Sequence, residues 1–253
     1  MEATSPLLTS VGVAHGFGGR RGGVSQGAYA SANASLASGD DPAAVAENRR
    51  RFAVALGAVP EALCTLRQVH GTAVHVAEAP SQHRVVGDAV VSAVPGLILA
   101  VTTADCVPVL VVDADARCAA AIHAGWRSAT SGIIAASLEA LCRLGATPGR
   151  CLAVIGPCIR AAGYEVDQPV RDAALAADPS AGYFFASRDV AERWQFDLAG
   201  FVARQLDQSG VKEVDDTGLD TLNQSSNYFS YRRSRQRGEA GYGVQLSGIV
   251  VPG

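Results

Sequence analysis

Residues 107–123 read VPVLVVDADARCAAAIH, two apolar runs on either side of a short polar segment. Residues 107–112 and 118–122 have the length and the β-branched or alanine-rich composition of buried strands. The polar residues 113–117 are predicted to form a tight turn. So short a connection cannot contain the crossover that parallel strands require. The two strands therefore pair antiparallel, and a purely parallel sheet is excluded.

The patterns on both sides of this hairpin predict helices as well as further strands. Apolar runs of strand length occupy residues 97–102, 152–155 and 243–251, and residues 63–76 are strand material interrupted at 68–71. Helices are expected at residues 42–57 behind a capping Asp41, after Trp126 to Gly145 with Thr130 or Ser131 as the cap, and near residues 169–177 and 196–208. We predict an α+β fold, a single domain over residues 1–253 with mixed β-sheets flanked by helices.

The composition narrows the classes of function. Of the 253 residues, 48% are apolar and 18% are charged, as in an ordinary globular protein. A net charge of −3 argues against a nucleic-acid partner, since phosphate backbones bind to basic surfaces. No apolar stretch reaches the roughly 18–20 residues of a membrane span, and no secretory signal is visible. We therefore expect a cytoplasmic protein without a nucleic-acid or membrane partner.

The six cysteines lie among apolar residues, at positions 64, 106, 118, 142, 151 and 158. In a reducing compartment such thiols serve packing, metal binding or catalysis more often than disulfides. Most of them are expected to be small buried apolar residues.

One cysteine, Cys106, is singled out by the hairpin. If residues 114–116 form the turn, Cys106 lies opposite His123 or Ala124, and directly opposed residues have Cβ atoms about 4.5–5.5 Å apart. A thiol and an imidazole would then meet at the open end of the hairpin, beside Asp105 and Arg127.

Two chemistries use a cysteine and a histidine at this separation. In the first, the histidine takes the thiol proton and the thiolate attacks an acyl or amide carbon. In the second, both side chains bind a metal ion, and a third ligand leaves one position open for water. The third ligand would come from His15, His70, His75 or His83, and His70 is best placed because it lies in a turn between strands.

The chain resembles the YfiH-type, laccase-like family, whose members are also named polyphenol oxidases. The resemblance covers nearly the whole chain. It is carried by Ser31, Asn33 and residues 21–25, 39–42, 47–49, 68–71, 88–89, 103–110, 123–127, 155–159, 164–166 and 228–233. The sequence departs from the family pattern at Ser128, where glycine is usual, and within residues 231–242.

The resemblance implies a fold similar to that of the cytotoxic-necrotizing-factor deamidases, with a zinc ion held by His70, Cys106 and His123. It also implies an enzyme whose partners are phosphate and purine nucleosides, with phosphorolysis of adenosine, inosine, guanosine and methylthioadenosine and deamination of adenosine. A role in peptidoglycan editing is attributed to the family as well. Copper is a less favoured metal, because five histidines cannot supply the separate sites of a multicopper oxidase.

Roles for individual residues follow from this activity. Arg127 would hold phosphate with its planar guanidinium, and backbone N–H groups of residues 21–25 would add donors. Asp105 is the nearest candidate carboxylate for acid–base chemistry, and Trp126 is a candidate for stacking on a base. The basic run at residues 231–237 fits a local anion site better than a nucleic-acid groove.

Two other functions remain open from the sequence. One is a cysteine hydrolase or deamidase that uses a Cys106–His123 dyad. The other is a protein that binds a nucleoside or a peptidoglycan precursor without turning it over.

Overall fold

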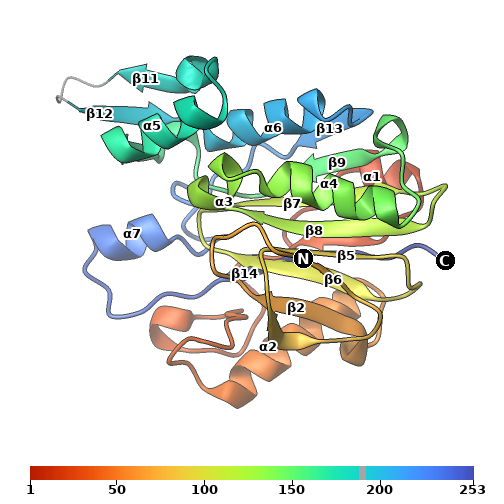
Figure 1. Ribbon diagram of the computed structural model, residues 1–253. Coiled ribbons are helices and arrows are strands. Elements are labelled where there is room, and N and C mark those ends of the chain that lie inside the picture. Colours follow the sequence, from red (N-terminus) through yellow and green to blue (C-terminus); the bar gives the residue numbers. More distant parts are fainter. Residues whose placement is uncertain (188–191) are drawn as a thin grey trace.

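The predicted hairpin forms the centre of a six-stranded sheet in the computed structural model, which describes residues 1–187 and 192–253 (Figure 1). The hairpin strands β7 (Val107–Asp113) and β8 (Cys118–Ala124) pair antiparallel. The strand order is β13-β9-β7-β8-β5-β3, with β13 (Glu213–Asp216), β9 (Leu152–Ile155), β5 (Ala89–Ser92) and β3 (Val74–Val76). The outer pairs β13–β9 and β3–β5 are parallel, so the sheet is mixed as predicted.

The register of the hairpin differs from the expected one. Val107 pairs with Ala124 and Pro108 with His123, so Cys106 lies just beyond the paired strands instead of opposite His123 or Ala124. The turn is one residue longer than expected, because Arg117 adopts a left-handed conformation with φ 52° and its N–H donates to Ala114. Such a conformation is uncommon outside glycine, and the strand pattern carries no sign of it.

A second sheet of five strands packs on the first. Its order is β1-β14-β6-β2-β4, with β1 (His15–Phe17), β14 (Gln245–Val250), β6 (Ile98–Thr103), β2 (Leu63–Arg67) and β4 (Gln82–Val86). Alternate residues of β6, Leu99 and Val101, face a buried cluster that also contains Leu110 and Val112 of β7. This cluster joins the two sheets face to face.

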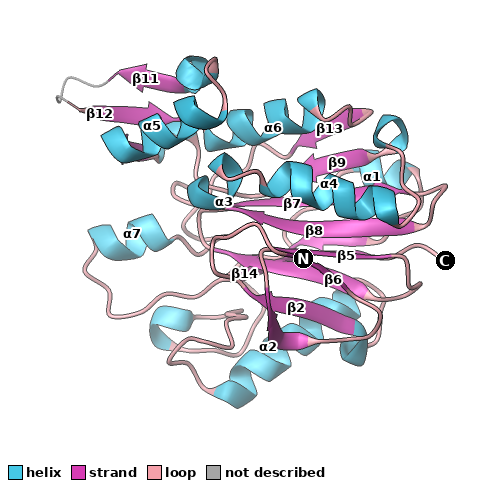
Figure 2. Ribbon diagram, viewed as in Figure 1, coloured by secondary structure: helices cyan, strands magenta, loops and turns pink. Residues whose placement is uncertain are grey.

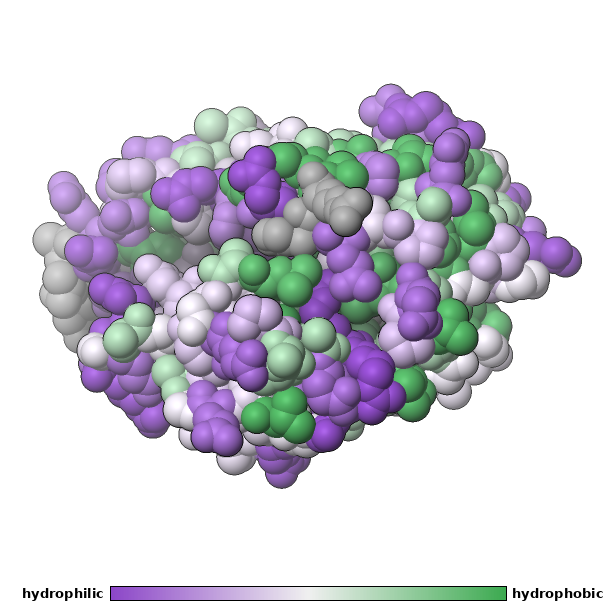
Figure 3. Space-filling model, turned by 90° about the horizontal axis from the view of Figure 1, so that it is seen from below, coloured by the Kyte–Doolittle hydropathy of each residue, from purple (hydrophilic) through white to green (hydrophobic). Residues whose placement is uncertain are grey.

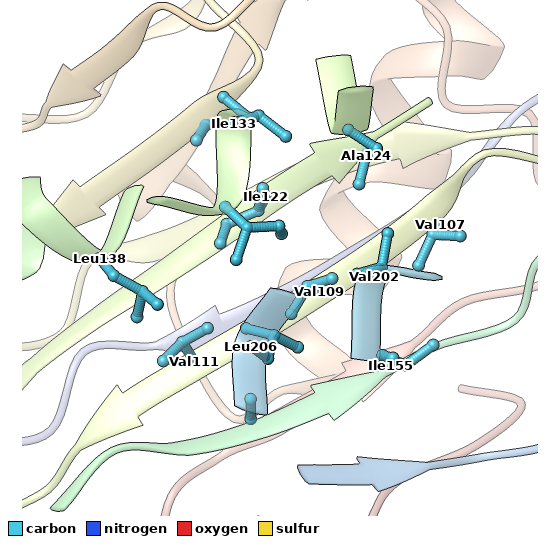
Figure 4. Packing of buried hydrophobic residues seen from close by; sticks show 14 of the residues in the cluster. Val107, Val109, Val111, Ile122, Ala124, Ile133, Leu138, Ile155, Val202 and Leu206 are labelled. Carbon is cyan, nitrogen blue, oxygen red and sulfur yellow. The ribbon is translucent and has the colours of Figure 1, made fainter. Parts of the chain in front are cut away.

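Helices cover the two outer faces, so the centre of the molecule has four layers (Figure 2). On the six-stranded sheet lie α4 (Ile133–Arg143) and α6 (Leu198–Gln208), and on the five-stranded sheet lies α2 (Pro42–Ala55). Val109, Ile122, Leu138 and Leu206 meet in the outer core (Figure 4). Because β7 and β8 are buried on both faces, their sequences are continuous apolar runs without alternation.

The remaining elements are short and lie at the periphery. They include α1 (Pro6–Ser10), α3 (Trp126–Thr130), α5 (Gln168–Ala177), α7 (Tyr231–Gln236) and a small sheet of β10 (Glu165–Asp167), β12 (Arg193–Phe196) and β11 (Phe185–Ser187). In the described residues, 3₁₀ turns lie at Gly27–Tyr29, Pro60–Ala62, Pro148–Arg150, Ala161–Gly163 and Ala181–Phe184.

The predicted α+β class is confirmed, but the helix expected after Trp126 is two helices. The chain ends α3 at Thr130 and begins α4 at Ile133, with Gly132 at φ 94° between them. Thr130 and Ser131 therefore do not cap the longer helix, because Gly132 occupies its N-cap position. Glycine adopts this left-handed conformation without the steric penalty of a Cβ.

In the described part of the chain no helix combines the length and the apolar composition that crossing a bilayer requires. On the lower face of the molecule, hydrophilic side chains are interspersed with small groups of hydrophobic ones (Figure 3). Ion pairs of Glu47 with Arg50 and Arg51 lie on the exposed side of α2.

Candidate metal centre

Three side chains from separate segments converge at one end of the central strands. His70 lies in the turn after β2, Cys106 immediately precedes β7, and His123 is near the end of β8. Their ligand atoms all lie within 4.8 Å of one another, and no other group of histidine, cysteine and acidic side chains in the described residues is as close. The Sγ of Cys106 is 3.8 Å from Nε2 of His70. The structure thus brings together the three residues singled out in the sequence.

A buried carboxylate, Asp88, fixes the orientation of His123. Nδ1–H of His123 donates to the carboxylate at 2.8 Å, and both side chains are almost fully buried. An ionised carboxylate only accepts hydrogen bonds, so the proton resides on Nδ1 and Nε2 is left to act as a ligand. The pKa of Asp88 is lowered, since the bonds from His123 and from backbone amides outweigh the effect of burial.

The same carboxylate holds the turn that carries His70. It accepts hydrogen bonds from the backbone N–H groups of Val69, His70 and Gly71 at 3.2, 2.9 and 2.7 Å. These bonds stabilise His70 at φ 60°, a conformation that is rare for a histidine and typical of functional sites. Asp88 therefore sets the positions of two of the three converging side chains.

Gln68 fastens this turn to the second sheet. Its side-chain amide donates to the carbonyl of Thr102 at 2.8 Å, and its carbonyl accepts from the N–H of Thr102 at 2.8 Å. The pair of bonds continues the contact between β2 and β6 beyond the last strand residue.

Glycine is required where the chain leaves β8. A Cβ added at Gly125 would lie 2.9 Å from Cδ2 of His70 and 3.1 Å from Sγ of Cys106. The backbone at Gly125 therefore lies close against the side chains of His70 and Cys106.

The charges of the cluster are coupled. Burial raises the pKa of the Cys106 thiol, but the neighbouring His123 and His70 outweigh it and lower the pKa to about 6. Burial lowers the pKa of His123, whereas Cys106 and Asp88 outweigh it and raise the pKa to about 9. The lowered pKa favours the thiolate of Cys106, which is the form that binds a metal ion and the form that acts as a nucleophile.

The cluster opens into a cavity of about 570 Å³, a volume within the usual range for small-molecule sites. The walls combine aromatic, arginine and hydroxyl side chains. The lining residues are Ser35, Ala37, Leu66, Gln68, His70, Thr102, Thr103, Ala104, Asp105, Cys106, His123, Trp126, Arg127, Ile159, Tyr164, Leu198, Tyr231, Arg232, Tyr242 and Val244.

Two arginines face this cavity. Arg127 is exposed, and its guanidinium lies 4.2 Å from the centre of the Trp126 ring. Within the described residues this guanidinium makes no hydrogen bond or ion pair, although the Arg127 carbonyl accepts from Thr130. Arg232 is half-buried and donates to the carbonyl of Glu165 at 2.8 Å, with its guanidinium over the ring of Tyr164. Arg127 thus presents an unengaged guanidinium to an anion, whereas Arg232 uses one of its donors on Glu165.

Asp105 is more constrained than the sequence indicates. Its backbone is left-handed, with φ 92°, and its carboxylate accepts from the Thr221 hydroxyl at 2.7 Å and the Arg232 amide at 2.6 Å. Burial raises its pKa, although these bonds oppose the effect. The carboxylate ties α7 to the segment that precedes β7.

Several sequence candidates lie elsewhere. Nε2 of His15 accepts from the amide of Ser5, and His75 lies within β3, while the side chain of His83 lies outside the described part. The amides of Gly23 and Val24 bond to Ser31 and Asn48, so these two N–H groups are not available to a bound anion. These residues also do not line the cavity.

The basic run at residues 231–237 forms α7, and its arginines do not act as one anion site. Arg233 is buried and donates to the carbonyls of Thr221, Leu222 and Tyr228. Of the four arginines in the run, only Arg232 lines the cavity of the cluster.

Comparison with known proteins identifies the relatives of this chain. A family model described as multi-copper polyphenol oxidoreductase laccase matches residues 14–251. The chain belongs to this YfiH-type, laccase-like family. It is 41% identical over 237 residues to a purine nucleoside phosphorylase of Streptomyces coelicolor, covering 91% of this chain and 95% of the relative. It is 40% identical over 230 residues to a purine nucleoside phosphorylase of Deinococcus radiodurans, covering 90% and 87%.

Solved structures of the YfiH-type family have the same fold. YlmD of Geobacillus stearothermophilus superposes with a TM-score of 0.90 at 28% identity, covering 98% of this chain and 94% of that one. The protein NMB0706 of Neisseria meningitidis superposes with a TM-score of 0.83 at 34% identity, with 92% of each chain covered.

The donors of this YfiH-type chain suit a transition metal. One thiol and two imidazoles form a set that zinc binds in proteins, and three protein ligands leave a fourth position for water or substrate. The carboxylate of Asp88 behind His123 is a common second partner of a metal-binding histidine. Asp88, Gln68 and Gly125 were not predicted to act at the site, although all three lie within the segments that carry the family resemblance.

Proposed function

We propose that this protein is a zinc-dependent purine nucleoside phosphorylase that also deaminates adenosine. The observation that carries the proposal is the His70–Cys106–His123 cluster at the base of a cavity that also presents the free guanidinium of Arg127. The phosphorylase names of relatives about 40% identical over most of the chain support the same activity.

His70, Cys106 and His123 would hold the zinc ion. When bound, zinc supplies Lewis acidity and lowers the pKa of a coordinated water. Asp88 accepts a hydrogen bond from Nδ1–H of His123. This leaves Nε2 of His123 free to bind the metal ion. Copper fits less well, since His15 and His75 lie away from the cluster and a multicopper site needs many more ligands.

Arg127 would bind the phosphate that attacks C1′ of the nucleoside. Its planar fork matches two phosphate oxygens, and its stacking on Trp126 pre-orients the guanidinium. In the reaction a phosphate oxygen bonds to C1′, the bond from C1′ to the purine nitrogen breaks, and the purine leaves with the electron pair. Tyr164, Tyr231 and Tyr242 offer aromatic surface to the base and sugar.

Asp105 would act as a positioning residue. Its carboxylate already accepts hydrogen bonds from Thr221 and Arg232, so it is poorly placed to exchange protons with a substrate. Its role is to keep α7, and with it Tyr231, against the cavity.

The products formed from adenosine test the proposal. Purified zinc-loaded protein is incubated with adenosine with and without inorganic phosphate, and the products are separated by chromatography. Adenine is expected only with phosphate, and inosine in both samples. Full activity of a Cys106→Ala variant, or adenine release that ignores phosphate, would refute the phosphorylase.

One observation favours a second candidate, a cysteine hydrolase or deamidase. Cys106, His123 and Asp88 form a thiolate–imidazolium–carboxylate array of the kind that activates cysteine nucleophiles. This function predicts full activity after exhaustive chelation of metal and loss of activity on alkylation of Cys106. The phosphorylase predicts that chelation alone abolishes activity.

A further inference from the structure

A second cavity adjoins the cavity of the metal centre. Its volume is about 250 Å³, and we call it the side cavity. The two cavities share four lining residues, Ser35, Ala37, Tyr242 and Val244. None of the three converging side chains lines the side cavity, so it extends the space available to a substrate away from the reacting centre.

The walls of the side cavity come from two segments that are far apart in the sequence. The segment that contains Tyr29 and the loop after α7 lie side by side in Figure 1. A Cβ added at Gly241 would lie 2.6 Å from the hydroxyl oxygen of Tyr29, so the two segments are in close contact. The ring of Tyr242 packs edge-on against Tyr231, at 5.1 Å between centroids, where the two cavities meet.

Two opposite charges line the side cavity. Arg235, in the last turn of α7, and Glu239 are its charged lining residues, and the other polar groups are hydroxyls of serine and tyrosine. Glu239 also pairs with Arg237 at 4.0 Å. A phosphate group would meet a carboxylate here, and a plain alkyl group would offer no opposite charge to the exposed side chains of Arg235 and Glu239. A zwitterion satisfies both.

We propose that the side cavity binds an α-amino acid group carried at C5′ of the nucleoside. This inference rests on the proposed phosphorylase function. The carboxylate of the extension would pair with Arg235 and its ammonium with Glu239, while the purine and ribose occupy the larger cavity. C5′ is the ribose carbon through which a nucleoside can be extended without altering its base or the bond that breaks.

The substrate class is therefore a purine nucleoside with a 5′-thioether chain that ends in an amino acid. Its phosphorolysis forms the bond from a phosphate oxygen to C1′ and breaks the bond from C1′ to the purine. The purine takes the electron pair and a proton from solvent. The sugar 1-phosphate retains the thioether chain, so the reaction needs no oxidant or reductant.

The test compares three nucleosides with the zinc-loaded enzyme and phosphate: adenosine, methylthioadenosine and S-adenosylhomocysteine. Adenine release gives kcat/KM for each. We expect S-adenosylhomocysteine to be cleaved with a higher kcat/KM than methylthioadenosine, which lacks the charged end. In Arg235→Gln and in Glu239→Gln, kcat/KM for S-adenosylhomocysteine should fall by about tenfold, the usual effect of losing one charge-assisted hydrogen bond. Adenosine should be unaffected.

Arg143→Gln is the matched control, because Arg143 is also an exposed arginine in the last turn of a helix and lies outside both cavities. It should change none of the three values. Cleavage of adenosine without cleavage of S-adenosylhomocysteine overturns the inference and leaves the phosphorylase standing. Equal losses for adenosine and S-adenosylhomocysteine in the Arg235 variant also overturn it. Cleavage of neither refutes both proposals.

Discussion

Asp88 connects the two histidines of the cluster through a single carboxylate. One oxygen accepts from His123 Nδ1 and the His70 amide, and the other accepts from the amides of Val69 and Gly71. A change at this residue therefore alters both a ligand and the turn that carries another ligand. Removing such a partner of a metal-binding histidine typically weakens metal affinity by about 10–100-fold.

We predict a loss of zinc affinity in that range for Asp88→Asn, because the amide can donate to His123 Nδ1 and favour the wrong tautomer. Competition with a fluorescent zinc chelator measures it. Asp113→Asn is the control, since Asp113 is an equally buried carboxylate that accepts backbone hydrogen bonds far from the cluster. Equal affinities for the two variants would contradict the role of Asp88.

In the metal-free protein, the thiol of Cys106 should react with alkylating agents at a lower pH than an ordinary cysteine thiol does. Its pKa of about 6, compared with an ordinary value of 9.0, results from His123 and His70 outweighing the effect of burial. The rate of alkylation by iodoacetamide, followed by mass spectrometry of the Cys106 peptide, should rise with a midpoint near pH 6. Zinc should suppress the reaction. A midpoint near pH 9 would show that the histidines do not stabilise the thiolate.

At the residue scale, the sequence was enough to identify the three residues of the cluster. It did not identify Asp88, the carboxylate that positions two of them. Cys106 and His123 were brought together by the hairpin, and His70 by its place in a turn and by family resemblance. Asp88 lies in a segment that carries the family resemblance, but that resemblance assigned it no role. Its role depends on the fold that places β5 beside β8.

The junction between β8 and α3 depends on a glycine. We predict that Gly125→Ala lowers zinc affinity by more than tenfold, because the added Cβ would lie about 3 Å from both His70 and Cys106. Isothermal titration with zinc measures the effect. Gly149→Ala is the control, since a Cβ there meets no atom within 4 Å. Unchanged zinc binding in the Gly125 variant would contradict the close approach.

The β7–β8 turn should make stability depend on pH. Asp113 accepts hydrogen bonds from Ala116, Thr147 and Arg150, and these outweigh burial and lower its pKa. A carboxyl with a lowered folded-state pKa stabilises the protein above its unfolded pKa of about 3.9. That stabilisation is lost as the pH falls through the folded-state pKa.

We therefore predict that Asp113→Asn lowers the free energy of unfolding by about 1–3 kcal/mol at pH 7. The difference from the wild type should shrink as the pH falls below about 4. Urea unfolding at pH 7, 5, 4 and 3 measures both. A difference that grows toward low pH would have the wrong sign for this account.

At the element scale, the buried strands were predictable and their register was not. Residues 152–155 form β9 as predicted, because a short apolar run has few alternatives. The left-handed Arg117 lengthens the turn by one residue and moves Cys106 out of the paired region. Short polar strands such as Glu165–Asp167 pair through backbone bonds, so their side chains show no apolar pattern.

The whole molecule places the cluster at the ends of strands that are buried on both faces. Four layers fix β7 and β8 in the centre, and the loops at one end of these strands carry His70, Cys106 and α3. A rigid scaffold with functional side chains on its loops is a common arrangement for enzymes. The mixture of helices and strands predicted this α+β class, whereas the face-to-face stacking of two sheets depends on contacts between residues far apart in the sequence.

The most direct test is a titration of zinc into the metal-free protein, with inosine and phosphate in excess and hypoxanthine release as the readout. The account predicts no activity without metal, a linear rise with added zinc and a plateau at one zinc per chain. The Cys106→Ser variant should stay inactive throughout. Full release of hypoxanthine by the metal-free protein would contradict the claim that this cluster is a catalytic zinc site.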